Sequence, residues 1–323
     1  MTRRTVHLVF AAVAAVGLLV SARVGAQQQN FDAVQVRVLP VQGSVYMLTG
    51  AGGNVTVQAG ADGVLIVDTQ FAQMSDKILA AIRGISKAPL RYIVDTHVHG
   101  DHVGGNESLR KAGATIAGGN VSGDIRDAGQ GAQIWAHDNV LLKMADPKRT
   151  PAIPAAAWPT STFTGKDKKL FFNGEGVHII HEPAAHTDGD SIVFFRRSDV
   201  ISTGDIFNTT NYPVIDVPGG GTINGMLAAV NHVIDLIIPV YGQEGGTMVI
   251  PGHGRLSDLG DVLNYREMAT IVRDRVQDMK KKGMTLEQVK AATPTRDYDP
   301  LYNPPGSFWT ADQFVEAVYG TLP

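Results

Sequence analysis

Two aspartates and three histidines crowd into residues 95–105, which read DTHVHGDHVGG. Carboxylates and imidazoles packed this closely repel one another when charged alike and are costly to bury without partners. His97 and His99 lie two residues apart, so in an extended backbone their side chains point to the same side. The glycine that follows lets the chain turn tightly, so Asp101 and His102 point in another direction. Two pairs with different directions suit two neighbouring metal ions better than one.

Three further residues of metal-ligand type each follow a short apolar run. His186 lies in AAHTDGDS, Asp205 lies in STGDIF and His253 lies in PGHG. Functional side chains commonly lie where a buried strand ends in a loop. Each residue alone is a weak signal, but together they complete a ligand set with the first motif. The chain has no cysteine, so any metal site must use nitrogen and oxygen ligands.

The remaining histidines of the mature chain are interpreted as structural. His178 and His181 are three residues apart in a predicted strand, so they face opposite sides of it. His137 is expected to begin a helix, and His232 lies within a predicted amphipathic helix. None of these positions is expected to take a direct part in chemistry.

Composition indicates a folded protein of one large domain or two small ones. The chain has 323 residues, of which 44% are hydrophobic and 18% are charged, enough to bury a substantial core. Its formal net charge is −3, so it has no general electrostatic attraction for nucleic acid. The basic run Lys280–Lys282 is interpreted as a solvated helix face.

The first 26 residues are predicted to be a signal peptide. Two arginines precede the apolar run Leu8–Val20, and the small residues Val24 and Ala26 occupy the −3 and −1 positions of a cleavage site. The run of 13 residues is shorter than the roughly 20 that span a bilayer. Cleavage after Ala26 implies a periplasmic or secreted protein with no stable membrane association, and an uncleaved N-terminal anchor is the alternative.

Strand and helix patterns follow one another twice along the chain. Short β-rich runs with glycine-containing breaks over residues 34–69 predict an antiparallel meander, followed by a helix over 73–86 with Ser75 as its cap. Two short helices near the C-terminus have Thr285 and Thr310 as caps. The other predicted elements are a strand at 90–96, a helix ending near 144, strands at 168–174, 177–183, 191–197 and 199–205, a helix at 222–238, a strand at 247–254 and a long helix at 261–283. Strands and then a helix, twice over, suggest two similar layers that face each other.

The motifs HVHGDH, AHTDGD, TGD and PGHG, in this order at strand ends, resemble the metallo-β-lactamase superfamily. The run VLIVDT, with Asp68, is similar to that family's approach to its first metal motif. The resemblance covers about residues 35–260 and implies an α/β (α+β) fold, a four-layer αββα sandwich with a binuclear metal site at one edge. We therefore expect a domain of this type over residues 27–263, and a helical extension over residues 264–323 that packs on the same domain.

The resemblance also implies a role for each motif residue. The first metal would be held by three imidazoles and the second by a carboxylate and two imidazoles, with one aspartate bridging the two: His97, His99 and His186, then Asp101, His102 and His253, and Asp205 as the bridge. Two zinc ions are the expected cofactors, and iron or manganese could occupy the same ligands. Asp68 would orient ligands rather than bind metal, the alternative being a buried aspartate that only ties loops together.

The implied reaction is hydrolysis of a small-molecule substrate. Two metals would lower the pKa of a bridging water, and the hydroxide would attack the carbonyl of a cyclic amide such as a β-lactam, a lactone or ester, or a thioester. Asp101 is the expected catalytic residue, orienting the nucleophile and moving its proton. The best-known zinc β-lactamases use a cysteine ligand that this chain lacks. A bridging Asp205 favours the pattern of thioesterases, lactonases and phosphodiesterases, whereas an Asp205 that points away would favour another β-lactamase subclass.

Substrate contacts are expected from the loop and helix that follow Asp205. Asn208, Tyr212 and Asn224 could hydrogen-bond a carbonyl or carboxylate, and Trp135 is interpreted either as part of a lid over the metals or as a core residue. Two other functions stay open: a non-catalytic periplasmic metal-binding protein on the same fold, and a mononuclear iron enzyme similar to sulfur dioxygenases. The sequence leaves the oligomeric state open.

Overall fold

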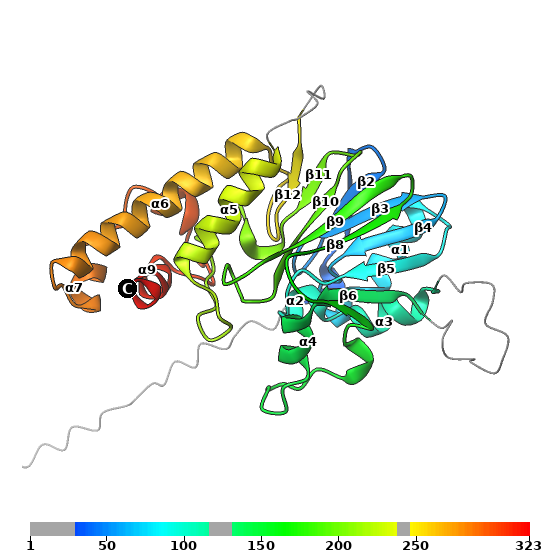
Figure 1. The fold of residues 1–323 in the computed structure, drawn as a ribbon, viewed down its shortest axis with the longest axis horizontal. Coiled ribbons are helices and arrows are strands. Elements are labelled where there is room, and N and C mark those ends of the chain that lie inside the picture. Colours follow the sequence, from blue (N-terminus) through cyan, green and yellow to red (C-terminus); the bar gives the residue numbers. More distant parts are fainter. Residues whose placement is uncertain (1–29, 116–130, 238–245) are drawn as a thin grey trace, which may run out of the picture. The chain divides into compact units, whose positions relative to one another are not determined.

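The computed structural model describes residues 30–115, 131–237 and 246–323 (Figure 1). The predicted signal peptide lies outside these ranges. In the described residues no helix is both long and apolar enough to cross a membrane.

A seven-stranded sheet is formed by the first half of the described chain, with its strands in sequence order from β1 to β7. Its strands are β1 (Arg37–Gln42), β2 (Val45–Thr49), β3 (Val55–Gly60), β4 (Gly63–Val67), β5 (Leu90–Val94), β6 (Gln133–His137) and β7 (Ser161–Phe163). Strands β1 to β4 pair antiparallel, which confirms the predicted meander, and β4 to β7 pair parallel. The helix between β4 and β5 makes the crossover that parallel pairing needs, so both strands end at the same edge.

A second sheet of five strands, in the order β12-β11-β10-β9-β8, is formed by later described residues. Its strands are β8 (Asp167–Phe172), β9 (Glu175–Glu182), β10 (Asp190–Phe195), β11 (Val200–Ser202) and β12 (Met248–Ile250). Strands β8 to β11 pair antiparallel, whereas β12 pairs parallel with β11. Each sheet thus has a parallel pair whose carboxyl ends carry predicted site residues to one edge.

Three layers of apolar side chains hold the fold together. Between the sheets, residues such as Leu65 and Phe195 are fully buried in one cluster. Helices α1 (Ser75–Ile85) and α3 (Asn106–Ala112) cover the outer face of the first sheet, and α5 (Ile223–Ile237) and α6 (Leu259–Lys281) cover that of the second (Figure 1). Replacing a buried phenylalanine such as Phe195 by alanine costs about 3–5 kcal/mol. The predicted αββα sandwich is confirmed.

The C-terminal helices share the core of the second sheet. Side chains of β11, α5, α6 and α9, among them Ile201, Val230, Tyr265 and Phe314, belong to one buried cluster. Residues Phe31–Pro323 form one compact unit, and α6 begins before residue 264, the position where the extension was expected to start. The remaining helices are α2 (Gly100–Val103), α4 (Asp138–Met144), α7 (Leu286–Ala291), α8 (Asp299–Tyr302) and α9 (Ala311–Thr321), with 3-10 turns at Phe31–Ala33, Ala72–Met74, Ala155–Ala157 and Gly204–Ile206.

Helix caps were predicted well near the C-terminus and wrongly at α1. Thr285 and Thr310 each accept a hydrogen bond from the backbone of a glutamine three residues later, in complete capping boxes. Ser75, however, is the first residue of α1 rather than its cap, because the 3-10 turn Ala72–Met74 leads directly into the helix. Strand β6 was not predicted either, since its apolar run is short and continues directly into α4.

Candidate metal centre

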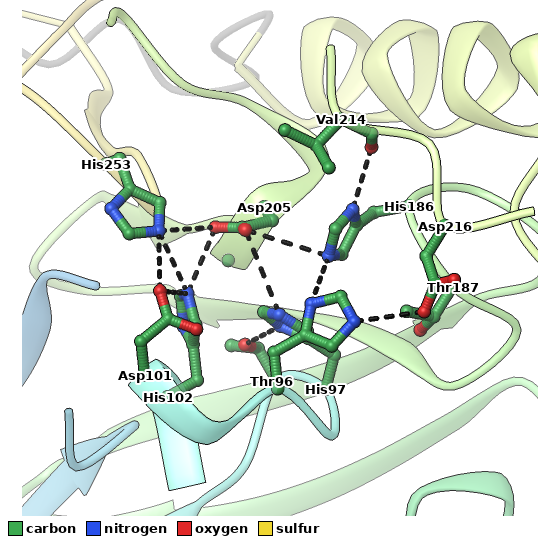
Figure 2. A network of polar contacts seen from close by, with 12 residues as sticks. Thr96, His97, Asp101, His102, His186, Thr187, Asp205, Val214, Asp216 and His253 are labelled. Carbon is green, nitrogen blue, oxygen red and sulfur yellow. Dashed lines mark hydrogen bonds and ion pairs between the residues drawn. The ribbon is translucent and has the colours of Figure 1, made fainter. Parts of the chain in front are cut away.

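All the predicted ligands meet at one edge of the two sheets (Figure 2). The segment after β5 carries His97 and His99, and its continuation as helix α2 carries Asp101 and His102. The loops after β9, β11 and β12 supply the other ligand-type residues, which are His186, Asp205 and His253. The change of direction after His99 is the start of α2.

Three imidazoles and one carboxylate form the first cluster, which consists of His97, His99, His186 and Asp205. Their ligand atoms lie within 4.8 Å of one another. Nε2 of His186 lies 2.9 Å from Nδ1 of His99. Oδ2 of Asp205 lies 3.6 Å from Nε2 of His186 and 3.9 Å from Nε2 of His97. The inner atoms thus point at a common centre.

Asp101, His102 and His253 form the second cluster, next to the first. Nε2 of His253 lies 3.3 Å from Nε2 of His102 and 3.2 Å from Oδ2 of Asp101. Oδ1 of Asp205 lies 3.2 Å from His102 Nε2 and 3.5 Å from His253 Nε2. Asp205 therefore presents one oxygen to each cluster and does not point away from either.

Asp68, at the end of β4, orients ligands of both clusters. Its Oδ2 accepts a hydrogen bond from Nδ1 of His102 at 2.7 Å. The same carboxylate accepts bonds from the hydroxyl and the backbone N–H of Thr96, each 2.8 Å long. The Thr96 hydroxyl oxygen in turn accepts from Nδ1 of His97 at 2.9 Å. Asp68 is buried and has a φ of 63°, a backbone conformation that non-glycine residues rarely adopt, so the fold holds it in place for these contacts.

The loop after η4 (Gly204–Ile206) orients the other two imidazoles of the first cluster. Nε2 of His99 donates to Oδ2 of Asp216 at 3.0 Å, and Nδ1 of His186 donates to the carbonyl of Val214 at 2.7 Å (Figure 2). Sequence reasoning missed Asp216, because it considered amide and phenol groups of this segment and passed over its carboxylate. The signal was present, since Asp216 is the acidic residue in the glycine- and proline-rich stretch.

The donor set fits divalent cations. His99 and His186 each donate their outer N–H to an oxygen, so their inner nitrogens, 2.9 Å apart, face each other with lone pairs and no proton between them. Nε2 of His97 and Oδ1 of Asp205 are buried without a hydrogen-bond partner. Unpartnered buried acceptors are costly in a folded protein, and a cation at each cluster would satisfy them. Nitrogen and carboxylate donors suit zinc, with iron and manganese as alternatives.

Charge differs between the two clusters. Burial holds the pKa of His97 well below its ordinary value and lowers that of His186 to about 4, so both rings are neutral. Burial also opposes charge on His102, but the Asp205 and Asp68 carboxylates outweigh it and raise the pKa of His102 well above its ordinary value. Burial likewise opposes charge on Asp205, whose pKa is nevertheless held well below its usual range by the histidines around it, His102 first. The carboxylates therefore remain ionised and available to a cation.

Two glycines allow the close approach of backbone to ligands. A Cβ at Gly53 would lie 2.3 Å from the ring of His102, and one at Gly252 would lie 2.1 Å from Oδ1 of Asp205. The N–H of Gly53 also donates to the carbonyl of Asp101 at 3.0 Å. Any side chain at either position would displace a ligand group.

Two predicted substrate contacts are wrong. Tyr212 is fully buried, stacks on Phe314, and donates its hydroxyl to the carbonyl of Thr295 and to Asp299. Asn208 is buried as well, and its side-chain oxygen accepts hydrogen bonds from the next backbone turn while its nitrogen contacts the hydroxyl of Tyr265. Both side chains are fully used inside the protein, because the loop after Asp205 folds inward against the C-terminal helices.

The predictions for Asn224, the third expected substrate contact, and for Trp135, the expected lid residue, have different outcomes. Asn224 is exposed at the start of α5 and accepts a hydrogen bond from Arg273, and its role toward substrate stays a prediction. Trp135 lies in β6, packs on the core between the sheets and has the ammonium of Lys168 4.3 Å from its ring centre. The lid hypothesis is therefore wrong, and the alternative of a core residue is confirmed.

The other described histidines have structural partners. His137 precedes α4 and accepts a hydrogen bond from the backbone of Asn139, and His181 stacks on it with ring centres 3.5 Å apart. The other two pair with carboxylates across neighbouring elements: His178 with Asp167, and His232 with Glu182. These contacts agree with a structural interpretation of all four.

An αββα sandwich whose edge carries clustered histidines and aspartates defines a class of metallohydrolase fold. Residues 48–256 match the sequence model of the Metallo-beta-lactamase superfamily, and the chain belongs to this superfamily. The proteins compared below are all less than 25% identical to this chain.

The linear primary-alkylsulfatase of Pseudomonas sp. (strain ATCC 19151) is 23% identical over 287 residues, which cover 74% of this chain and 50% of that protein. The chain thus spans about half the length of this curated relative. Among solved structures, DIM-1 metallo-beta-lactamase is 17% identical with a TM-score of 0.54, covering 73% of this chain and 98% of its own. A metallo-beta-lactamase from Pontibacter korlensis is 15% identical with a TM-score of 0.55, covering 73% and 99%. A double mutant of the sec-alkyl sulfatase PisA1 is 16% identical with a TM-score of 0.61, covering 88% and 50%. At these identities the structures share the fold alone.

Proposed function

We propose that the protein is a binuclear metal-dependent hydrolase that cleaves a lactone, ester or thioester. The observation that carries the proposal is the position of Asp205, with Oδ2 facing the imidazoles of the first cluster and Oδ1 facing those of the second. A carboxylate so placed can bridge two cations. Two zinc ions are the proposed cofactors, with iron or manganese as alternatives.

When bound, the cations would polarise the substrate carbonyl and make water acidic enough to attack it near neutral pH. Asp101 is the residue that would accept a proton from the attacking water. Its side chain is 28% exposed and its carboxylate lies at the second cluster. Burial opposes ionisation of Asp101, but the hydrogen bond with His253 and the charge of His102 keep its pKa lowered, so it is ionised and able to accept a hydrogen bond from water. The reaction adds one water across the acyl bond, and yields a carboxylic acid and an alcohol or thiol.

The position of Asp205 also bears on the choice of bond. A bridging aspartate resembles the pattern of thioesterases, lactonases and phosphodiesterases, whereas dedicated β-lactamases hold the second metal with a cysteine or without the bridge. We therefore place β-lactam hydrolysis behind acyl ester, lactone and thioester hydrolysis.

Sulfate ester hydrolysis is the second candidate. The alignment with the alkyl sulfatase structure covers 88% of this chain, against 73% for the two β-lactamase structures, so it includes more of the region outside the shared core. A sulfatase would release the alcohol and inorganic sulfate from an alkyl sulfate.

The test is a substrate panel with zinc-reconstituted protein, with and without a chelator. The panel contains an acyl-homoserine lactone, an acyl ester, a thioester, a chromogenic cephalosporin, a phosphodiester and an alkyl sulfate. We expect chelator-sensitive turnover of an acyl substrate, lowered about 10²-fold or more in Asp101→Asn with the metal content kept. Two bound metals with no turnover of any member would contradict the proposal, and would favour a metal-binding protein without catalysis.

A further inference from the structure

A large hollow adjoins the candidate metal centre at His99. Its volume is about 740 Å³, and most of its lining is apolar: Val214, Val217, Pro218, Phe308, Trp309 and Ala317. We call this hollow the C-terminal pocket, because α9 and the segment before it form one of its walls.

The other wall of the C-terminal pocket is continuous with the metal centre. It is the loop 214–218, whose Asp216 accepts the hydrogen bond of His99 and whose Val214 carbonyl accepts that of His186. The two walls are joined by Trp309, whose indole N–H donates to the carbonyl of Pro213 at 3.1 Å. A group seated in the pocket therefore lies next to any substrate atom at the first cluster.

The lining selects for an uncharged occupant. No lysine or arginine is among the lining residues, and its carboxylates are already paired: Asp216 with His99, and Glu316 with Lys290. Phe308 is 73% exposed and Val217 is 43% exposed, so two apolar side chains stand uncovered at the same hollow.

A second hollow, which also includes His99 in its lining, has a charged character. It has a volume of about 400 Å³, shares His99, Asp216 and Pro218 with the first hollow, and is lined by the cations Lys143, Lys148 and Arg149. Of these two hollows beside His99, the C-terminal pocket is therefore the one suited to an apolar group.

We propose that the C-terminal pocket binds the uncharged apolar chain of the substrate, an acyl or alkyl chain attached to the bond that is cleaved. This inference rests on the proposed function and names its substrate class, an ester with a long apolar chain. The C-terminal segment then determines specificity, although it supplies none of the candidate ligands.

The experiment uses a series of nitrophenyl esters from acetyl to decanoyl with zinc-loaded protein. Each methylene that enters the pocket should raise kcat/KM about fourfold, until the pocket is filled. Gly320→Leu should abolish this increase, so that kcat/KM no longer rises with chain length. Gly320 lies in α9 on the pocket wall with no atom within 4 Å of a built Cβ, so the leucine fits the helix and projects into open space.

Gly84→Leu is the matched control. Gly84 also lies in a helix, α1, is exposed, and has no atom within 4 Å of a built Cβ. This variant should keep the full dependence on chain length. A second variant, Phe308→Ser, removes an exposed apolar wall and should weaken the dependence by about the contribution of one or two methylenes.

Decanol binding gives a readout that does not depend on turnover. Calorimetric titration of decanol should show binding to the parent protein and to Gly84→Leu, and loss of binding in Gly320→Leu. Chelator-sensitive turnover with equal rates for short and long chains would overturn the pocket proposal and leave the proposed function standing. Absence of metal-dependent ester turnover with decanol still bound would overturn the proposed function instead. If Phe308→Ser turns a dimer into a monomer in sedimentation, and decanol does not bind, the pocket is an interface between copies and the proposal is wrong.

Discussion

The two ligand clusters of the metal centre differ in burial and in charge. In the first, His97 and His186 are fully buried, and burial keeps both rings neutral. In the second, the side chains of Asp101 and His253 are 28% and 26% exposed, and only His102 is fully buried. The first cluster thus contains two fully buried, neutral imidazoles beside the partly exposed His99, whereas the second offers a carboxylate and an imidazole that solvent can reach.

Under the proposed function the two clusters would have different tasks. A cation held by the imidazoles of the first cluster would keep most of its positive charge and would suit polarisation of a substrate oxygen. A cation beside Asp101 would be partly neutralised, and the exposed carboxylate would accept a proton from attacking water. Asp205 couples the two, because it is the carboxylate with one oxygen at each cluster.

Asp205→Asn should have the largest effect, because it removes the charge that both clusters share. Metal affinity should fall at both positions, by more than the about 10- to 100-fold that loss of an outer hydrogen-bond partner costs. Metal content after dialysis, measured by inductively coupled plasma mass spectrometry, checks this. Asp278→Asn, at an exposed aspartate of α6, is the control and should keep its metals. A variant that loses metal from one position only would show that Asp205 belongs to one cluster.

His186→Ala and His253→Ala should separate the clusters. Each should lower the metal content by about one equivalent, the first from the neutral cluster and the second from the exposed one. The metal-free His186→Ala protein should also be less stable by about 1–3 kcal/mol, because the partly buried carbonyl of Val214 loses its donor. His253→Ala should lose less stability, since its ring is partly exposed and solvent replaces it. Urea denaturation in the presence of a chelator measures the free energy of unfolding of both variants. Equal losses of stability would contradict the difference in burial between His186 and His253.

The sequence predicted the ligands better than it predicted their surroundings. Ligands are specified by residue type at strand ends, so histidines and aspartates in short motifs identify them locally. Asp216 and Tyr212 depend instead on how a long loop folds: one orients His99, and the other turns inward against α9. Local spacing carries no information on that choice, since contacts between residues 83 to 117 apart along the chain decide it.

For the fold, too, locally patterned elements were predicted and elements that depend on distant segments were not. Alternating apolar patterns predicted the meander, a short apolar run predicted strand β5, and the ordered motifs predicted the sandwich. Strand β6 and the turn before α1 were missed, because the strand has only five residues and continues directly into α4, and the 3-10 turn continues directly into α1. The two hollows beside His99 were beyond sequence reasoning, since each is assembled from segments distant in the chain.

Asp68→Asn and Asp216→Asn compare the outer partners of the two clusters. Asp68→Asn should weaken metal binding about 10- to 100-fold, mainly at the second cluster, because an amide cannot accept all the hydrogen bonds that the carboxylate accepts from His102 and Thr96. Asp216→Asn should have a smaller effect, confined to the first cluster, because Asp216 is 27% exposed and water can substitute for it at His99. Competition with a chromophoric chelator gives both affinities. A larger effect of Asp216→Asn would reverse this order and make the loop 214–218 the main support of the centre.

The smallest effect is expected at the residue that joins the clusters, Gly100, between His99 and Asp101. Glycine there was expected to be needed for a tight turn, but the chain enters α2 at this position, its φ is not in the left-handed region, and no atom lies within 4 Å of a built Cβ. Gly100→Ala should therefore keep both metals and its activity within about twofold, and gain about 0.4–1 kcal/mol of stability because alanine restricts the unfolded chain. Gly53→Ala is the contrasting variant, since its Cβ would lie 2.3 Å from the ring of His102, and it should lose metal from the second cluster. Metal content and thermal unfolding of the two variants test this expectation. If Gly100→Ala loses metal as Gly53→Ala does, glycine is required between His99 and Asp101, and the positions set by the sheets are not sufficient to hold the two clusters.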